Sequence, residues 1–211
     1  CGERPCDKFA QARSARDDYR EDALHASAHL VGCGRLQHGH PEDRTHIVGG
    51  THTGRHDRGD NECGQIGVVD GIADLAKSFV VGDALDPATQ VGLLASAIHR
   101  DRVESYIAIG KTEARLVAGG GRPVLGGKGW FVQPTVFADV SNSAIIAREE
   151  IFGPVLSIIR YTDEAETLKI ANDSDYGLGG SVWSADPERA TKLARLVESG
   201  SIGINGYIPD L

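Results

Sequence analysis

Apolar residues are distributed unevenly along this chain of 211 residues, and this asymmetry constrains the fold more than any other feature. Residues 1–67 contain 19 apolar side chains, about 28%, whereas residues 68–211 contain 66, about 46%. Because burial of apolar surface must offset the conformational entropy lost on folding, only the second segment carries enough apolar residues for a core. We therefore predict one domain over residues 68–211, and leave residues 1–67 unassigned, as a disordered or out-of-frame leader.

The overall composition excludes several classes of partner. A net charge of −8 provides no basic field to replace phosphate counterions, which argues against binding to nucleic acid. No apolar run approaches the roughly 18 residues of a membrane span, and no signal peptide opens the chain. The chain contains no methionine, even at position 1, which indicates a fragment. We expect a cytoplasmic protein with no membrane partner and with its four cysteines as free thiols.

Helix and strand signals alternate from Val68 onward. Helices are predicted over 69–79, from the cap Ser96 to Glu113, from the cap Thr162 onward, and from the cap Asp186 with Pro187 to Gly200. The predicted buried face of the second helix comprises Ile98, Val103, Tyr106 and Ile107. Strands are predicted over 115–118, 130–137 with a bend at Pro134, 155–161, 180–183 and 201–205. Strands that alternate with helices through short links imply right-handed crossovers, so we predict an α/β fold with a mostly parallel sheet and flanking helices.

Five motifs follow one another in this segment. They are Val80–Gln90, Gly129–Phe137, Glu149–Val155 (Glu-Glu-Ile-Phe-Gly-Pro-Val), Ala171–Leu178 and Ser201–Gly206. Their order and spacing resemble those of the NAD(P)-dependent aldehyde dehydrogenases, and the resemblance covers residues 68–211. It implies a Rossmann-like aldehyde dehydrogenase catalytic domain that is incomplete at both ends.

The resemblance implies three cofactor-binding residues. In the family, the residue matched by Glu150 hydrogen-bonds to the nicotinamide ribose hydroxyls, and the residue matched by Phe152 packs near the nicotinamide. Arg102 matches a position that approaches the adenosine side. A carboxylate accepts hydrogen bonds from a diol, and an apolar ring supports a flat cofactor ring, so these residue types suit NAD or NADP. The alternative is that Glu150 is a solvated acid and Phe152 a core residue.

The reaction that the resemblance implies is oxidation of an aldehyde to a carboxylic acid with NAD(P)⁺. It needs a cysteine thiolate as nucleophile and a glutamate as general base. By the spacing of the family the thiol belongs near position 52, which is histidine here, and nothing in residues 1–67 matches the glutamate. Cys63 is the nearest thiol and a remote candidate, so we predict an oxidoreductase by family that is inactive alone. Family members form homo-oligomers through a strand that this chain lacks.

Two alternatives remain open. One is a non-catalytic remnant that associates with intact homologues as an interaction module. The other is a small zinc-binding protein, with candidate ligands Cys33, His38, His40, His46, His52, His56 and Cys63. Because the Cys33, His38 and His40 spacing matches no standard ligand set, we predict no metal site. Arginine outnumbers lysine 16 to 6, which is typical of a GC-rich gene and favours a frame slip ahead of Val68.

Overall fold

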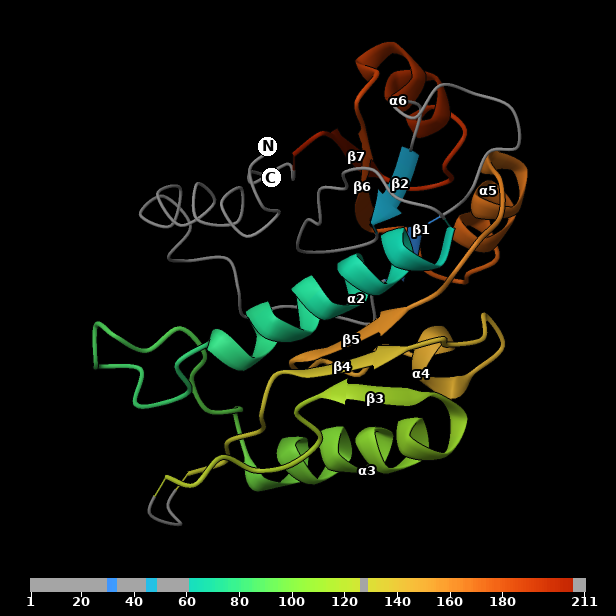
Figure 1. Ribbon diagram of the computed structural model, residues 1–211. Coiled ribbons are helices and arrows are strands. Elements are labelled where there is room, and N and C mark those ends of the chain that lie inside the picture. The colour runs from blue at the N-terminus through green and yellow to red at the C-terminus, as the bar shows by residue number, and fades with distance from the viewer. Residues whose placement is uncertain (1–29, 34–44, 49–60, 126–128, 207–211) are drawn as a thin grey trace.

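The computed structural model describes residues 30–33, 45–48, 61–125 and 129–206. In chain order the elements are β1 (Leu30–Cys33), β2 (Thr45–Val48), α2 (Asn61–Ser78), α3 (Ala97–Glu113), β3 (Arg115–Ala118), β4 (Thr135–Ala138), α4 (Ile145–Arg148), β5 (Val155–Ile158), α5 (Glu164–Asn172), β6 (Gly179–Ser184), α6 (Pro187–Ala194) and β7 (Ser201–Ile204). The strands form one sheet in the order β3-β4-β5-β1-β2-β6-β7, with helices packed around it (Figure 1). The predicted α/β class is confirmed.

The sheet is mixed. Strands β4 and β5, β5 and β1, and β6 and β7 pair in parallel, whereas β3 and β4, β1 and β2, and β2 and β6 pair antiparallel. Among the strands after residue 68, β3 and β4 are the pair that differs from the predicted parallel arrangement. The described part of the chain between these two strands holds no helix, and an antiparallel pair needs no crossover helix.

Strands β1 and β2 were not anticipated from the sequence. They lie between β5 and β6 and link the two halves of the sheet. Each contains four residues and lies in the apolar-poor segment 1–67, where the sequence shows no sustained strand period. Helix α2 likewise begins at Asn61, ahead of the predicted start at residue 69. Most of residues 1–67 lies outside the described ranges, and the division of the chain at residue 67 stays a prediction.

Strand β4 lies at the centre of the core, because one helix packs against each of its two faces. Its Val136 lies in one apolar cluster with Ile72 and Ala76 of α2. The next residue, Phe137, lies in a second cluster with Ile107 of α3. Since successive side chains of a strand point to opposite faces, this arrangement places α2 and α3 on the two sides of the sheet (Figure 1).

Side-chain caps fix where two of the helices begin. Ser96 Oγ accepts a hydrogen bond from the His99 N–H at 3.1 Å and starts α3. Asp186 Oδ1 accepts from the Glu188 N–H at 2.9 Å and starts α6, with Pro187 in the first turn. The first N–H groups of a helix have no partner within the helix, so such caps favour helix starts at these residues. Both predicted starts are confirmed.

The predicted cap of α5 was wrong by one residue. Asp163 is the cap, and its Oδ1 accepts from the Glu166 N–H at 2.8 Å. Thr162 instead donates its hydroxyl and its N–H to Glu166 Oε2, at 2.6 and 2.7 Å. The Thr162 hydroxyl is therefore occupied as a donor, and these bonds hold the pKa of the Glu166 carboxyl below its ordinary value.

Further boundaries differ from the prediction, and β5 ends at Ile158 rather than at residue 161. Strand β4 begins at Thr135 rather than at residue 130, because Pro134 has no N–H to donate to a neighbouring strand. Helix α6 ends at Ala194 rather than at Gly200. The N–H of Gly200 donates instead to the Gly177 carbonyl at 2.8 Å, which directs the chain into β7.

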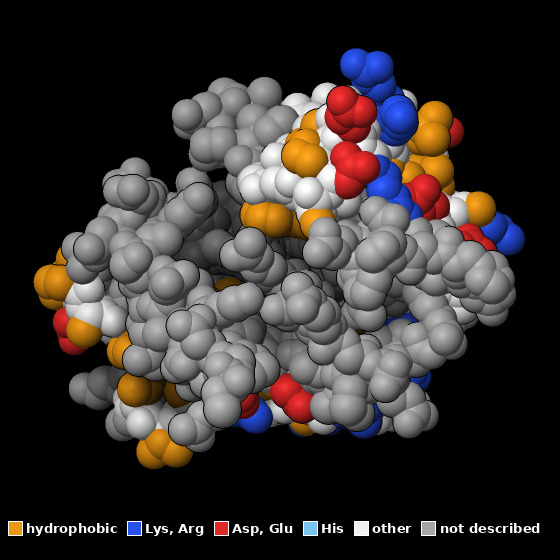
Figure 2. Space-filling view, turned by 45° about the horizontal axis from the view of Figure 1, so that its top comes forward, with side chains coloured by type: hydrophobic (Ala, Val, Ile, Leu, Met, Phe, Trp, Pro, Cys, Tyr) orange, Lys and Arg blue, Asp and Glu red, His pale blue; other side chains and the backbone are white. Residues whose placement is uncertain are grey.

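One residue of the predicted face of α3 is exposed. Val103 and Ile107 are buried, whereas Ile98 is 83% exposed. At about 100° per residue, five positions rotate a side chain by about 500°, which places Ile98 about 140° away from Val103 around the helix. Figure 2 shows such hydrophobic side chains at the surface together with neighbouring acidic and basic ones.

Within the described ranges, no helix has the length and apolar character needed to cross a membrane.

Candidate functional site

The candidate site is the loop Glu149–Gly153, which joins α4 to β5. Burial alternates along it: Ile151 is fully buried and Gly153 is buried, whereas Glu150 is partly exposed and the Phe152 side chain is 47% exposed. Ile151 and Gly153 therefore anchor the loop in the core, while the Glu150 carboxylate and the Phe152 ring stay accessible at the surface. Phe152 is not a core residue, so that part of the alternative is wrong, whereas a solvated Glu150 stays open.

The N-terminal half of helix α3 holds the backbone of this loop. The Arg102 guanidinium donates to the carbonyl oxygen of Glu150 at 2.8 Å. His99 Nε2 hydrogen-bonds to the carbonyl oxygen of Phe152. Because these two carbonyls flank the buried Ile151, the loop is fixed at both sides of its anchor.

A second contact ties the start of the loop to the same helix. The Tyr106 hydroxyl donates to Glu149 Oε2 at 2.5 Å. The Arg102 guanidinium carbon lies 5.6 Å from the centre of the Tyr106 ring, within the range of a cation–π contact. Arg102 thus contacts both the loop and the residue that binds Glu149.

Two backbone features permit the close approach of the loop to α3. A Cβ added at Gly153 would lie 2.7 Å from the Val103 methyl groups, so only glycine fits against this buried valine. Phe152 has a φ of 53°, in the left-handed region that non-glycine residues rarely adopt. The loop is therefore held in a tight and strained conformation.

The chemistry of the site suits a nicotinamide riboside. In the part of the chain that the structure describes, the Glu150 carboxylate has no hydrogen-bond or ion-pair partner, and an ionised carboxylate accepts hydrogen bonds from a diol. The exposed Phe152 ring offers an apolar surface to a planar ring. The structure brings Arg102 to the same loop, while its predicted contact with the adenosine side stays a prediction.

Other candidates lie elsewhere. Cys63 is in the first turn of α2, and its role as a nucleophile stays a prediction. Among the proposed zinc ligands, Cys33 and His46 are opposite one another in the pair of β1 and β2. Four others, at positions 38, 40, 52 and 56, lie outside the described residues. The described residues contain no group of three or more side chains suited to hold a metal ion.

Sequence reasoning missed the part that His99, Tyr106 and Glu149 play in this site. The two helical residues lie at positions i and i+7, with Val103 between them at i+4, which places all three on one face. That spacing signals a face that packs against another segment, but it does not identify the segment. The contact of His99 with Phe152 spans 53 residues, so its partner is set by the tertiary fold.

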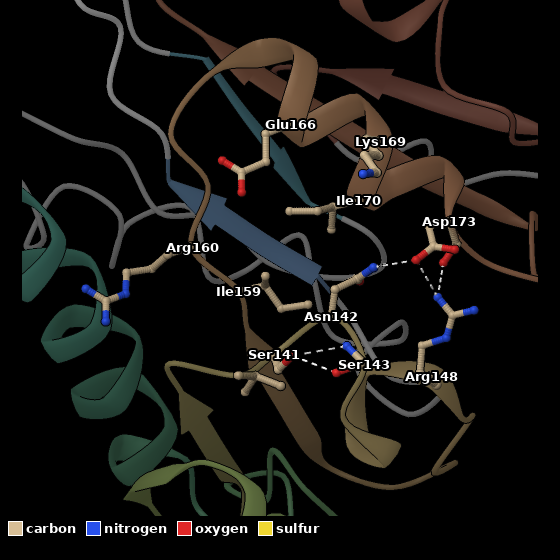
Figure 3. Close-up of a pocket in the computed structure, with 11 residues that line it drawn as sticks. Ser141, Asn142, Ser143, Arg148, Ile159, Arg160, Glu166, Lys169, Ile170 and Asp173 are labelled. Atoms are coloured by element: carbon tan, nitrogen blue, oxygen red, sulfur yellow. Dashed lines mark hydrogen bonds and ion pairs between the residues drawn. The ribbon is translucent and has the colours of Figure 1, made fainter.

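A separate cleft of about 610 Å³ lies between α5 and the loop that follows β4 (Figure 3). Two of its charged groups form an ion pair: Arg148 binds Asp173 at 3.0 Å, and Asn142 donates to the same carboxylate at 2.8 Å. Glu150 and Phe152 do not line it. The contacts in this cleft join α4 to the end of α5, and the cleft is distinct from the candidate site.

A bidentate ion pair ties the next turn of α3 to the segment after β3. Arg122 donates to the two carboxylate oxygens of Glu104 at 2.5 and 2.7 Å. This hydrogen-bonded pairing lowers the pKa of Glu104 from its ordinary value, against the smaller opposing effect of burial. The Glu104 carboxylate is therefore more acidic in the folded chain than in the unfolded chain.

This shift predicts an acid sensitivity that depends on Arg122. Because the folded pKa of Glu104 is the lower one, its stabilisation is present above the unfolded value near 4.5 and is lost as the pH falls through the folded value. We expect Arg122→Met to raise the Glu104 pKa toward that value and to flatten the acid limb of stability against pH. Carboxyl NMR titration and unfolding at several pH values measure both effects. The control Lys77→Met removes an exposed ion pair with Asp74 and should leave the Glu104 titration unchanged.

The sequence of this chain matches a known protein family. The model of the aldehyde dehydrogenase family matches residues 66–210. Geranial dehydrogenase of Castellaniella defragrans is 64% identical over 144 residues, which are 68% of this chain and 30% of that protein. Betaine aldehyde dehydrogenase 1 of Rhizobium meliloti is 48% identical over 138 residues, which are 64% of this chain and 28% of that protein.

Solved structures agree with the sequence comparison. An aldehyde dehydrogenase of Mycobacterium tuberculosis complexed with NAD⁺ matches with a TM-score of 0.66 and 50% identity, over 68% of this chain and 30% of that one. A betaine aldehyde dehydrogenase of Staphylococcus aureus in complex with NAD⁺ matches with a TM-score of 0.68 and 33% identity, over 72% and 31%. The chain thus spans about 30% of the length of the relatives it matches. The matched segment contains the loop and the helix that holds it, and the chain belongs to the aldehyde dehydrogenase family.

Proposed function

We propose that this chain is part of an enzyme that oxidises an aldehyde to a carboxylic acid, and that Glu149–Gly153 binds the nicotinamide riboside end of NAD(P)⁺. The observation that carries the proposal is the loop itself: α3 binds the backbone carbonyls of Glu150 and Phe152, which leaves the Glu150 carboxylate partly exposed and the Phe152 ring at the surface. NAD⁺ in the related structures supports the choice of cofactor. When bound, the cofactor supplies the hydride acceptor, and the reaction consumes one water and releases one proton.

Each residue of the loop has a role in this proposal. Glu150 accepts hydrogen bonds from the ribose hydroxyls and so fixes the position of the sugar. Phe152 packs against the nicotinamide and keeps water away from one side of the ring. Ile151 and Gly153 bind no ligand, because they are buried and hold the loop on the core.

The loop predicts a specific loss of cofactor binding. We expect Glu150→Ala to weaken NAD⁺ binding by about 10- to 100-fold, because hydrogen bonds to an ionised group are lost. Calorimetric titration of the full chain with NAD⁺ measures this change. Glu198→Ala is the matched control, since this exposed acid lies after α6 and uses its backbone rather than its carboxylate in its described hydrogen bond. Equal affinities for the wild type and Glu150→Ala would contradict the proposed site.

We further propose that the chain binds the cofactor without oxidising an aldehyde on its own. By the family spacing the thiol belongs near position 52, which is histidine here, and Cys63 is the nearest thiol. Geranial and betaine aldehyde are the substrates to test, since they are the aldehydes named for the relatives. NADH absorbance should stay at background with either aldehyde. NADH formation that is abolished by Cys63→Ser would contradict this proposal and assign the nucleophile.

The second candidate function is association with an intact homologous subunit. It is favoured by large apolar side chains at the surface, where Leu85 is 91% exposed and Leu178 is 83% exposed. Exposed apolar residues mark a surface that another chain covers only where they form a contiguous patch, so the mixing experiment decides whether these residues contribute to an interface. Size-exclusion chromatography of a mixture with geranial dehydrogenase tests this function, and separate elution of the two chains would contradict it.

A further inference from the structure

Phe152 adopts a backbone conformation that its own side chain disfavours. Its φ of 53° lies in the left-handed region, where a bulky residue is an outlier. Such a conformation persists only where the surrounding structure enforces it, and it is common at ligand-binding sites. Some contact of this loop must therefore hold Phe152 in place.

His99 makes that contact. Its Nε2 is bonded to the Phe152 carbonyl oxygen, and since a carbonyl only accepts, Nε2 must carry the hydrogen. His99 is itself fixed at the start of α3, where its backbone N–H donates to Ser96 Oγ at 3.1 Å. The bond thus runs from a capped helix turn to the strained residue.

Because of the residues on either side of Phe152, the bond from His99 determines the direction in which the Phe152 ring points. Ile151 is fully buried, and Gly153 lies against Val103 with no room for a Cβ. Both flanking residues are therefore fixed in the core, and the remaining freedom is rotation of the peptide units around Phe152. A bond to the Phe152 carbonyl restrains one of these peptide units directly.

We propose that His99 is a positioning residue that holds Phe152 in the left-handed conformation and so keeps the nicotinamide-binding loop in its ligand-competent shape. This inference rests on the proposed cofactor function of the loop. A loop that reaches the competent shape only part of the time binds its ligand more weakly in proportion to that fraction. Loss of the His99 bond is therefore expected to lower cofactor affinity through the shape of the loop.

Two readouts test this role in the full chain. Amide hydrogen exchange of residues 149–156 reports the loop without any ligand, and calorimetry reports the dissociation constant for NAD⁺. We expect His99→Ala to accelerate exchange of the loop and to raise the dissociation constant, each about fivefold, which corresponds to one hydrogen bond. His99→Gln keeps an N–H donor and should restore both values. Ile98→Ala, at the adjacent exposed position of α3, should change neither.

The outcomes separate the inference from the proposed function. Wild-type exchange in His99→Ala, or equal losses in His99→Ala and His99→Gln, would overturn the role of His99. Failure of the wild-type chain to bind NAD⁺ would overturn the proposed function, while the exchange experiment would still show whether His99 holds the loop. If His99→Ala does not fold, His99→Asn replaces it, because the shorter amide does not reach the Phe152 carbonyl and should lose what His99→Gln retains.

Discussion

Replacement of Phe137 by alanine is expected to lower the free energy of unfolding by about 3–5 kcal/mol. Phe137 has no exposed surface, and its ring fills the space between β4 and α3. The packing there is close, because a Cβ added at Gly110 of α3 would lie 2.7 Å from the ring. Since small domains are stable by only about 5–15 kcal/mol, this single change removes a large part of the total. Urea denaturation followed by tryptophan fluorescence measures it.

Leu85→Ala provides the control for this prediction. Leu85 is 91% exposed, so its truncation is expected to change the free energy of unfolding by no more than about 0.5 kcal/mol. A loss below about 1 kcal/mol for Phe137→Ala would show that the core between β4 and α3 is not packed as described.

The second large effect concerns the buried anchor of the loop. Ile151→Ala is expected to cost about 2–5 kcal/mol, because the side chain has no exposed surface and its removal leaves a cavity. The same change releases the segment between the two carbonyls that Arg102 and His99 hold. We therefore expect a loss of NAD⁺ affinity as well as of stability, measured by urea denaturation and by calorimetry.

Ile151→Val is the matched variant. It removes one methylene group and should cost about 0.5–1.5 kcal/mol, with the loop and its cofactor affinity retained. Equal stability of Ile151→Ala and the wild type would contradict the burial of this residue. Full NAD⁺ affinity in a folded Ile151→Ala chain would show that the loop does not need the Ile151 side chain to bind the cofactor.

Local signals predicted much of the fold. The capping residues Ser96 and Asp186 fixed two helix starts, because a cap and the N–H that it binds lie within three positions of one another. The α5 cap was missed by one residue, since Thr162 and Asp163 both have side chains that form caps. The choice depended on Glu166, whose carboxylate binds the Thr162 hydroxyl.

Non-local pairing was not predictable in the same way. Strands β1 and β2 join the sheet between β5 and β6, although nothing in their four-residue sequences identifies a partner. The antiparallel pairing of β3 with β4 likewise depends on how the intervening segment returns across the sheet. Sequence patterns indicate that a strand exists, whereas its neighbours depend on contacts between distant segments.

The candidate site shows the same division. Glu150 and Phe152 were identified from motifs that resemble a family, and the structure shows the Phe152 ring at the surface. The residues that hold the loop were not identified, because His99 and Tyr106 contact it across 53 and 43 positions of the chain. Their polar atoms acquire a role only when α3 packs beside the loop.

We propose above that the Glu149–Gly153 loop binds the nicotinamide riboside end of the cofactor. The most direct test is the NMR shift of the Phe152 ring during titration of the full chain with nicotinamide mononucleotide, which carries only that end of the cofactor. We expect a saturable shift of the Phe152 signals that is lost in Glu150→Ala. Unchanged Phe152 signals, or an equal shift in Glu150→Ala, would contradict it.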